Sequence, residues 1–429
     1  MACDTPSAAD PFADVPRLSR RAVTPGERWI YSAGFNVDPE LRSTGRIDTE
    51  VPELARLRAA GARVAVLSHQ GSHRDQSAGS LAHVAAYLGR RLGRPVGYCP
   101  DNAGDEAAET AARMRPGDIV VFGNTRRHPG EEQGAPALAR RFARLGERVA
   151  VGGFSKAHRA HASNTGLVGL LPGYATDSLM SEAAFLGPWA RTAPGRRSAA
   201  LLGGRKPEKT LVGLAQAVDG HDLVIPGGVV LNTLLRALGH DIGDSDLGSR
   251  PDACLTAARR ALDRTDAAGL HIPETVWVAP AGAGAGAPAR PVAPADGVPP
   301  GYAIVDFTVR PWAVDRLAAS DSAVLAGTPC RYLDGHRRAA DALLAALPDG
   351  GRSLLLGGDT VAELPWSGPT STGGGSALEL LATGTCAVFE ALRAQAMGAA
   401  AGPQAVSGDR PNSPPPFPVP CPRPLRNRR

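Results

Sequence analysis

Lysine is almost missing from this sequence. The chain of 429 residues contains three lysines, Lys156, Lys206 and Lys209, and arginine supplies the remaining 44 of its 47 basic residues. Long apolar runs are missing too, because no stretch reaches the roughly 18 residues that a membrane-spanning helix needs. The first twenty residues are polar and lack the apolar core of a signal peptide. We therefore expect no membrane association.

Paired cysteines and long basic runs are also missing. The six cysteines are scattered and none forms a C-x-x-C pair, which argues against a zinc site or a disulfide framework. This usage fits a reducing cytoplasm. The net charge is only +5, so we expect no nucleic-acid partner. A mild positive surplus instead suits an enzyme that gathers anionic small molecules into a cleft.

Apolar strands alternate with amphipathic helices in two series. In the first, strands such as "RVAVLSHQG" (63–71) and "DIVVFGNTRRH" (118–128) flank helices such as "SLAHVAAYLGRRLG" (80–93). The second begins at "RSAALLGGRK" (197–206) and includes "GLHIPETVWV" (269–278) and "RSLLLGGDT" (352–360). Short connections and wholly apolar strands indicate parallel sheets covered on both faces. The pattern predicts an α/β fold of two doubly wound, Rossmann-like domains joined by a hinge.

The same pattern places the domain boundaries. Residues 279–301 are of low complexity, and we expect a flexible surface insertion there. We expect a flexible N-terminal tail over 1–26, an N-terminal α/β domain over 27–177, a linker helix and hinge over 178–197, a C-terminal α/β domain over 198–399, and a disordered proline-rich tail over 400–429.

Basic and imidazole side chains follow the strands of the first series. Ligands of parallel sheets bind at the carboxyl ends of the strands, so these groups are expected to converge on a phosphate or carboxylate. Each one alone is more simply a surface residue, and the inference depends on their number. Asn36 joins the set Arg46, His69, Arg126, Arg127, His128, His158, Arg159 and His161.

Glycines and a lysine follow the strands of the second series. In "STGGGSALELL" (371–381), three glycines lead into a helix whose N–H groups can bind a phosphate. In "LLLGGDT" (354–360), Asp359 can hold Mg²⁺ and Thr360 can reach a phosphate, although either can simply cap a helix. Lys206 follows "LLGG", where a flexible ammonium can track a phosphoryl group.

These motifs together resemble the phosphoglycerate kinase family over about residues 27–385. The resemblance implies Mg²⁺-dependent phosphoryl transfer between ATP and the carboxylate of 3-phosphoglycerate, by a monomer. The segments that carry it are "AGFNVD" (33–38), "SHQGSH" (68–73), "GNTRRHPGEE" (123–132), "KAHRAHAS" (156–163), "LGGRKP" (202–207), "LGGDT" (356–360) and "STGGGSALELL" (371–381).

The resemblance also implies roles for single residues. Arg46, Lys206 and Gly374 would serve catalysis, and Asp359 would hold Mg²⁺. The acid substrate would be held by Asn36, Arg46, His69, Arg126 and Arg159. ATP or ADP would be held by Lys206, Gly227, Gly358, Asp359, Thr360, Gly373, Gly374 and Gly375.

Several family positions carry other residues here. Gly34 stands where the family has an aspartate, Ser72 where it has an arginine that contacts the triose phosphate, and Ala326 where it has an asparagine. Arg74 lies near enough in sequence to replace the missing arginine. Thr210 occupies the position of a second family lysine, with Lys209 one residue earlier. Three functions stay open: a 3-phosphoglycerate kinase, a kinase for another phosphorylated or phosphono carboxylic acid, and an inactive binding or regulatory relative.

Overall fold

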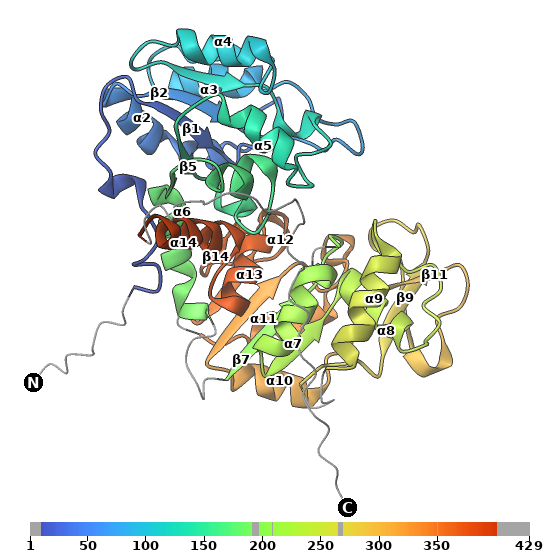
Figure 1. The fold of residues 1–429 in the computed structure, drawn as a ribbon. Coiled ribbons are helices and arrows are strands. Elements are labelled where there is room, and N and C mark those ends of the chain that lie inside the picture. The colour runs from blue at the N-terminus through green and yellow to red at the C-terminus, as the bar shows by residue number, and fades with distance from the viewer. Residues whose placement is uncertain (1–9, 191–196, 208, 265–268, 350, 401–429) are drawn as a thin grey trace, which may run out of the picture.

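Two parallel β-sheets form the framework of the chain, one in each half (Figure 1). The computed structural model describes residues 10–190, 197–207, 209–264, 269–349 and 351–400. The first sheet has the strand order β3-β4-β2-β1-β5-β6 and is parallel throughout. Its strands are β1 (Arg28–Ser32), β2 (Arg63–Leu67), β3 (Gly97–Cys99), β4 (Ile119–Phe122), β5 (Arg148–Val151) and β6 (Gly173–Ala175).

Helices cover both faces of the first sheet because its strands are apolar on both sides. In β1, Trp29 and Tyr31 face one core and Ile30 faces another. The first core includes α2 and α3, and the second includes α4 and α5. The helices of this half are α1 (Gly45–Asp48), α2 (Val51–Ala59), α3 (Ala82–Arg91), α4 (Asp105–Arg113), α5 (Pro136–Ala143) and α6 (Asp177–Leu186).

The second sheet is also parallel, with the order β14-β13-β12-β7-β8. Its strands are β7 (Ser198–Leu202), β8 (Leu223–Pro226), β12 (Ser322–Ala326), β13 (Ser353–Leu356) and β14 (Thr370–Ser371). The helices of this half are α7 (Ala215–Gly220), α8 (Gly228–Ala237), α9 (Pro251–Leu262), α10 (Pro311–Ala318), α11 (Arg338–Ala346), α12 (Gly358–Glu363), α13 (Gly375–Thr383) and α14 (Ala387–Ala400). The two sheets confirm the predicted fold class.

A small antiparallel sheet lies beside the second parallel sheet. It has the order β10-β9-β11, formed by β9 (Val276–Pro280), β10 (Arg290–Val292) and β11 (Tyr302–Phe307). The prediction of a flexible insertion over 279–301 is therefore wrong, since two of these strands lie partly or wholly within it. Val276 and Val278 are buried in one core with β7, β8 and β12. The low-complexity composition concealed strands that tertiary packing holds in place.

The described residues that precede β1 pack onto the body. Within the expected tail 1–26, Phe12, Val15 and Leu18 are buried, and residues 1–9 lie outside the described part. The ring of Phe12 lies 4.6 Å from that of Phe389, which explains why residues 10–26 are not a free tail. Residues 401–429 of the expected C-terminal tail are outside the described residues.

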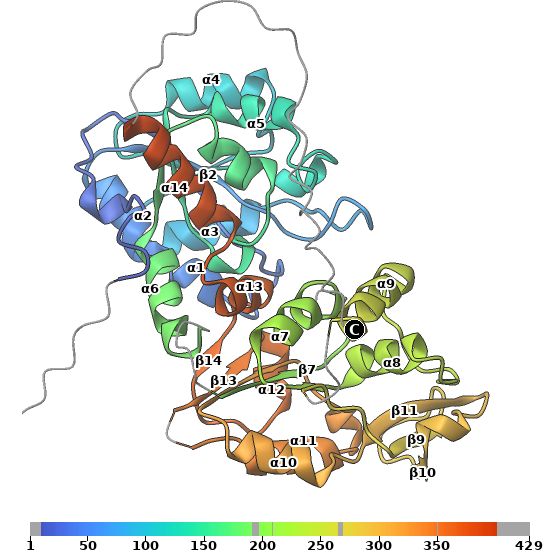
Figure 2. The same cartoon turned by 60° about the horizontal axis from the view of Figure 1, so that its bottom comes forward.

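The last helix returns to the first half of the chain, against the expectation of a single C-terminal domain over 198–399. Gln395 of α14 donates to the carbonyl oxygen of Leu171 (2.6 Å) and accepts from the backbone N–H of Gly173 (2.6 Å). Figure 2 shows α14 alongside the first half, with α6 and α13 at the junction between the halves. One apolar core runs through this junction, from Phe142 of α5 through Phe389 of α14 to Leu354 of β13.

Among the described residues, no single helix is long and apolar enough to cross a membrane. Helices α13 and α14 pass that test of length and composition only as a pair, which is bent by 59° at the break between them.

Candidate functional site

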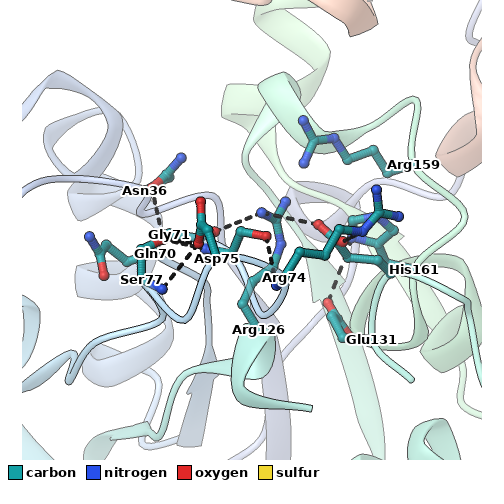
Figure 3. A network of polar contacts seen from close by, with 12 residues as sticks. Asn36, Gln70, Gly71, Arg74, Asp75, Ser77, Arg126, Glu131, Arg159 and His161 are labelled. Atoms are coloured by element: carbon teal, nitrogen blue, oxygen red, sulfur yellow. Dashed lines mark hydrogen bonds and ion pairs between the residues drawn. The ribbon is translucent and has the colours of Figure 1, made fainter. Parts of the chain in front are cut away.

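Polar side chains and loops gather at the carboxyl edge of the first sheet (Figure 3). Asn36 follows β1, and its side-chain oxygen accepts a hydrogen bond from the backbone N–H of Gly71 (3.4 Å), which follows β2. The carbonyl oxygen of Gly71 in turn accepts from Nη1 of Arg126 (2.7 Å), which follows β4. Arg46 of α1 donates to the carbonyl oxygen of Asn36 (3.2 Å). The structure thus brings together Asn36, Arg46 and Arg126.

Arg126 is firmly held at this edge. Its side chain is 8% exposed, and Nη1 lies 3.2 Å from a carboxylate oxygen of Glu132. Its Nε is buried and has no hydrogen-bond partner among the described residues. A buried donor without a partner is costly, and an anion that accepts from it would remove that cost. The guanidinium is therefore both fixed in place and still able to bind a ligand.

Two histidines near Arg126 are held neutral. Burial, and next the charge of Arg126, lower the pKa of His69 well below its usual range. Burial, and next the charge of Arg159, lower the pKa of His161 to about 3. The 3.8 Å approach of His161 Nδ1 to Glu131 is therefore not an ion pair at neutral pH. Both rings can donate or accept hydrogen bonds without adding charge.

Arg159 extends from a loop fastened by a buried lysine. Nζ of Lys156 donates to Ser32 (2.9 Å) and to Oδ1 of Asn164 (2.9 Å). Asn164 then donates to the carbonyl oxygens of Lys156 (3.1 Å) and Arg159 (2.8 Å), so it closes the loop at both ends. Burial lowers the pKa of Lys156 to about 8, although Glu131 and Glu50 raise it. Lys156 therefore has a structural role beneath the basic edge.

A close backbone contact accounts for Gly34. A Cβ on this residue would lie 2.9 Å from Cα of Gly153, and Gly153 itself has a φ of 69°. The backbone N–H of Gly153 donates to Glu50 (2.8 Å), which is buried. The two loops therefore approach so closely that neither position has room for a side chain. The aspartate that the resemblance leads one to expect at position 34 cannot be accommodated without a backbone shift.

Arg74 does not replace the arginine missing at Ser72 as a buried contact. Its side chain is 74% exposed, and its Nε lies 3.5 Å from the Glu132 carboxylate that also pairs with Arg126. Ser72 accepts from the backbone N–H of Arg74 (3.2 Å) and donates its own N–H to Ser77. Figure 3 shows Arg74 and Asp75 beside Arg126, so carboxylates lie among the cations at this edge.

Two members of the predicted anion pocket make contacts of other kinds. Nε2 of His128 lies 2.7 Å from the side-chain oxygen of Asn102, and its ring packs against Phe142. Burial lowers the pKa of His128 as well. Arg127 donates to the carbonyl oxygen of Ala78 (3.3 Å). The prediction that His128 joins the pocket is not supported, because its ring points into the body, whereas Arg127 is exposed and its place in the pocket stays a prediction.

At the carboxyl edge of the second sheet, three loops interlock through their backbones. A Cβ on Gly203 would lie 2.4 Å from the carbonyl oxygen of Thr328, and one on Gly227 would lie 2.4 Å from that of Pro329. The N–H of Gly204 donates to Thr328 (2.7 Å), and that of Gly228 donates to Pro329 (2.8 Å). Gly227 is therefore needed for packing between loops. Ala326 ends β12 just before these contacts, and its carbonyl oxygen accepts from Gly203.

The remaining two lysines lie beside these loops and differ in burial. Lys206 follows β7 and is exposed, whereas Lys209 is 9% exposed and belongs to a short π-helix over Lys209–Leu214. Thr210, at the family's second lysine position, is buried, and its hydroxyl has no partner among the described residues. Of these two lysines, Lys206 is therefore the one that solvent and a ligand can reach.

Helix α12 begins directly after β13 at Gly358. A Cβ on Gly358 would meet nothing within 4 Å, so the space beside its backbone is open. Thr360 is buried, and the side chain of Asp359 lies outside the described part of the chain. Among the described residues, no three His, Cys, Asp or Glu side chains group as a metal site. A Mg²⁺ held by one carboxylate and by nucleotide phosphates fits this arrangement, because Mg²⁺ rarely uses an all-protein cage.

The third glycine loop, Gly373–Gly375, lies against the first half of the chain. A Cβ on Gly373 would lie 2.7 Å from the ring of Phe154, and one on Gly375 would lie 2.8 Å from Nε2 of His158. Gly374 has a φ of 55° and precedes α13. Glycines are thus required here by neighbours as well as by backbone conformation. At the start of α13 the N–H of Ser376 donates to the carbonyl oxygen of Gly373 (3.2 Å), and a helix N-terminus of this kind favours anions.

Sequence reasoning missed the contact between these two halves. The resemblance pointed to the triple glycine as a nucleotide site, but not to the residue after it, Ser376, which pairs with His158. It also missed Glu132, the carboxylate that fixes Arg126. The acidic pair in "GNTRRHPGEE" was the available signal for Glu132. Ser376 carried no local signal, because its partner lies 218 residues away.

Comparison with known proteins gives one consistent result. The family model for phosphoglycerate kinase matches residues 29–384. The chain is 35% identical to the phosphoglycerate kinase of Rhodospirillum centenum over 83% of its own length and 94% of that protein. It is 33% identical to a phosphoglycerate kinase of Thermus thermophilus over 86% of its own length and 97% of that protein. The solved structure of phosphoglycerate kinase from Coxiella burnetii aligns with a TM-score of 0.65 at 25% identity, covering 90% of this chain and all of that one.

Proposed function

The chain belongs to the phosphoglycerate kinase family, and from that premise we propose that it transfers the terminal phosphoryl group of ATP to the carboxylate of 3-phosphoglycerate, reversibly. A carboxylate oxygen forms the new bond to phosphorus, the bond from phosphorus to the bridging oxygen of ADP breaks, and an acyl phosphate results. The observation that carries the proposal is the pairing of two edges, one rich in cations and one rich in glycine, at the carboxyl ends of two parallel sheets.

The first edge suits an acid with two anionic groups, a carboxylate and a phosphate. We assign Arg126, Arg159, His69 and Asn36 to binding it, with Arg46 placed between the acid and the transferring group. Arg126 supports this assignment most directly, since its buried Nε lacks a partner and its other contacts hold the guanidinium in place. Charge-assisted hydrogen bonds from arginine to phosphate are among the strongest in proteins. Neutral His69 adds a hydrogen bond without repelling Arg126.

The second edge suits the phosphates of a nucleotide. We assign their binding to the backbones of Gly227, Gly358 and Gly373–Gly375 and to Thr360. Helices α8, α12 and α13 all begin at this edge, and helix N-termini favour negative charge. Lys206, exposed at the same edge, is assigned to the transferring phosphoryl group together with Arg46 and the N–H of Gly374. Such catalysis depends mainly on positioning and charge neutralisation.

Mg²⁺ is the metal that this chemistry requires, and Asp359 is the residue that we assign to it. When bound, the ion neutralises phosphate charge as transfer proceeds. Asp359 is the second residue of α12 and follows Gly358, beside whose backbone the space is open for a nucleotide. We further propose a monomer in the cytoplasm. Free thiols at Cys99, Cys330 and Cys386 agree with a reducing compartment.

The test is an assay of ADP release with ATP, Mg²⁺ and 3-phosphoglycerate, with hydroxylamine added to trap the acyl phosphate. We expect turnover by the wild-type chain and a large loss of kcat in Lys206→Ala. Lys206 is exposed, so this variant should fold normally. Turnover that does not depend on Lys206 would contradict the assigned role, and ATP binding without turnover of any acid would indicate an inactive relative.

A second candidate substrate is another phosphorylated or phosphono carboxylic acid. Two features favour it. The backbone contact between Gly34 and Gly153 excludes a side chain from one part of the first edge, and Ser72 stands where the family has an arginine. An acid of different shape would suit the resulting space. A panel of such acids in the same assay decides between the candidates by their kcat/KM values.

A further inference from the structure

A helix of a single turn carries Arg46, which we assign to the transferring phosphoryl group. Helix α1 spans only Gly45–Asp48, and a helix this short is not stable by itself in water. Thr44 precedes it at the N-cap position but does not cap it with its side chain, because its hydroxyl donates to Asp48 instead (2.7 Å). Contacts with the rest of the fold must therefore hold α1 in place.

Three consecutive side chains of α1 point in different directions. Successive residues of an α-helix are about 100° apart around its axis, so Arg46 and Asp48 lie about 200° apart. Ile47, between them, is fully buried in the core that includes α2 and α3. Arg46 donates to the carbonyl oxygen of Asn36 at the first edge, whereas Asp48 contacts α3. A contact that fixes Asp48 therefore holds the side of α1 opposite to Arg46.

Three side chains surround the carboxylate of Asp48. It accepts from Oη of Tyr87 (2.8 Å) and from the hydroxyl of Thr44, and it pairs with Nε of Arg91 (2.8 Å). Tyr87 and Arg91 are four residues apart on α3, so they lie on the same face of that helix. Figure 2 shows α1 and α3 next to each other. We call these four residues, Thr44, Asp48, Tyr87 and Arg91, the Asp48 network.

The Asp48 network lies at the surface and is unlikely to decide whether the chain folds. The side chain of Asp48 is 30% exposed and that of Arg91 is 49% exposed, and ion pairs with such exposure contribute little to global stability. The network nevertheless joins a helix of four residues to one of ten. A displacement of about 1 Å in a group that contacts the reacting atoms can cost a large factor in rate. Loss of the network should therefore affect the reaction more than the fold.

We propose that Asp48 is a positioning residue for phosphoryl transfer, which holds α1 against α3 so that the guanidinium of Arg46 stays at the first edge. The proposal rests on the proposed function for the role of Arg46. The charge of Arg91 offsets that of the Asp48 carboxylate, so the network does not repel an anionic substrate. With α1 already fixed, Arg46 stabilises the transferring group without a prior ordering step.

The first experiment is a double-mutant cycle of kcat, measured with ATP, Mg²⁺ and 3-phosphoglycerate. In the wild-type background we expect Asp48→Ala to lower kcat by about 5- to 100-fold, while the KM for ATP changes by less than about 2-fold, because the nucleotide is assigned to the other sheet. In the Arg46→Ala background, Asp48→Ala should change kcat by less than about 2-fold, because the residue through which Asp48 acts is already missing. Tyr87→Phe removes one donor and should lower kcat by a smaller factor.

Asp105→Ala is the matched control. The carboxylate of Asp105 pairs with Arg144 at 2.8 Å, the same distance as in the Asp48 pair, and it joins α4 to the end of α5 over the opposite face of the sheet. We expect this variant to keep the wild-type kcat. Equal losses from Asp48→Ala in the two backgrounds would show a general structural effect and overturn the proposal. An unchanged kcat of Asp48→Ala in the wild-type background would overturn it as well.

Failure of the proposed function gives a different result, because the wild type then turns over no acid. Hydrogen exchange of the backbone amides of the free chain does not depend on the substrate and decides in that case. Faster exchange confined to residues 44–50 in Asp48→Ala and in Tyr87→Phe, and absent in Asp105→Ala, would support the placement of Arg46 by Asp48. Unchanged exchange of residues 44–50 would refute it.

Discussion

The two edges of the candidate site are held together by different kinds of contact. At the first sheet, side chains hold one another: Glu132 fixes Arg126, and Asn164 fixes the loop of Arg159. At the second sheet, backbones hold one another, through Gly203 against Thr328 and Gly227 against Pro329. The difference suggests that the acid side can change specificity by single side-chain replacements. The nucleotide side tolerates few changes, because a Cβ at these interlocked glycines displaces a loop.

Among the substitutions that test this comparison, removal of Arg126 should have the largest effect on substrate binding. We expect Arg126→Met to raise the KM for the acid by roughly 10- to 150-fold, from the ~1.5–3 kcal/mol that a hydrogen bond to a charged group contributes. The KM for ATP should stay nearly constant, because Arg126 belongs to the other edge. Steady-state kinetics with each substrate varied in turn measures both values. An equal rise in the two KM values would argue against separate binding edges.

Two glycine substitutions test the backbone side. Gly227→Ala places a Cβ 2.4 Å from the carbonyl oxygen of Pro329 and should destabilise the protein by ~1–3 kcal/mol, the usual cost of overpacking. Gly358→Ala meets open space and should leave stability unchanged, yet raise the Kd for ATP if the nucleotide lies there. Urea unfolding and ATP titration of both variants give these values. Normal ATP affinity in Gly358→Ala would remove Gly358 from the proposed site.

The buried lysine predicts a pH dependence of stability. The pKa of Lys156 is about 8 in the folded chain and 10.5 in its ordinary state, so the unfolded chain binds more protons between these values. Burial of the charge therefore destabilises the fold below about pH 8, and this cost should fall as the pH rises from 8 to 10.5.

We expect the free energy of unfolding of the wild type, relative to Lys156→Met, to increase over that range. Urea unfolding of both proteins at pH 7, 8, 9 and 10 measures the difference. A difference that stays flat would show that Lys156 keeps an ordinary pKa. Glu131, Glu50, Arg159, His69 and His161 are the charged or titratable groups around it, and they are common to both proteins.

Removal of Arg74 should have the smallest effect on the KM for the acid. It is 74% exposed, and surface ion pairs of this kind contribute about 0–1 kcal/mol. We expect Arg74→Ala to change the KM for the acid by less than about 3-fold, in contrast to Arg126→Met. The two variants remove the same type of charge from the same Glu132, so burial is the main difference between them. A large effect of Arg74→Ala would mean that it does replace the arginine missing at Ser72.

The alternation of strands and helices predicted the two parallel sheets, because strands such as β1 are apolar on both faces. It could not predict the strand at 290–292, or that the apolar stretch 269–278 leads into a separate antiparallel sheet, since these depend on pairing between β9, β10 and β11. Local sequence placed Arg126 and the glycine loops at strand ends correctly. It could not show that His128 points to Asn102, that Gly34 meets Gly153, or that His158 meets Ser376, since these contacts join distant segments.

The central claim is that side chains of the first sheet hold the acid while backbones of the second hold the nucleotide. Calorimetric titration of Arg126→Met and Gly358→Ala, each with 3-phosphoglycerate and with ADP, tests it most directly. The account predicts a crossed result, in which Arg126→Met weakens only the acid and Gly358→Ala weakens only the nucleotide. Loss of both ligands in either variant, or of neither ligand in both, would contradict it.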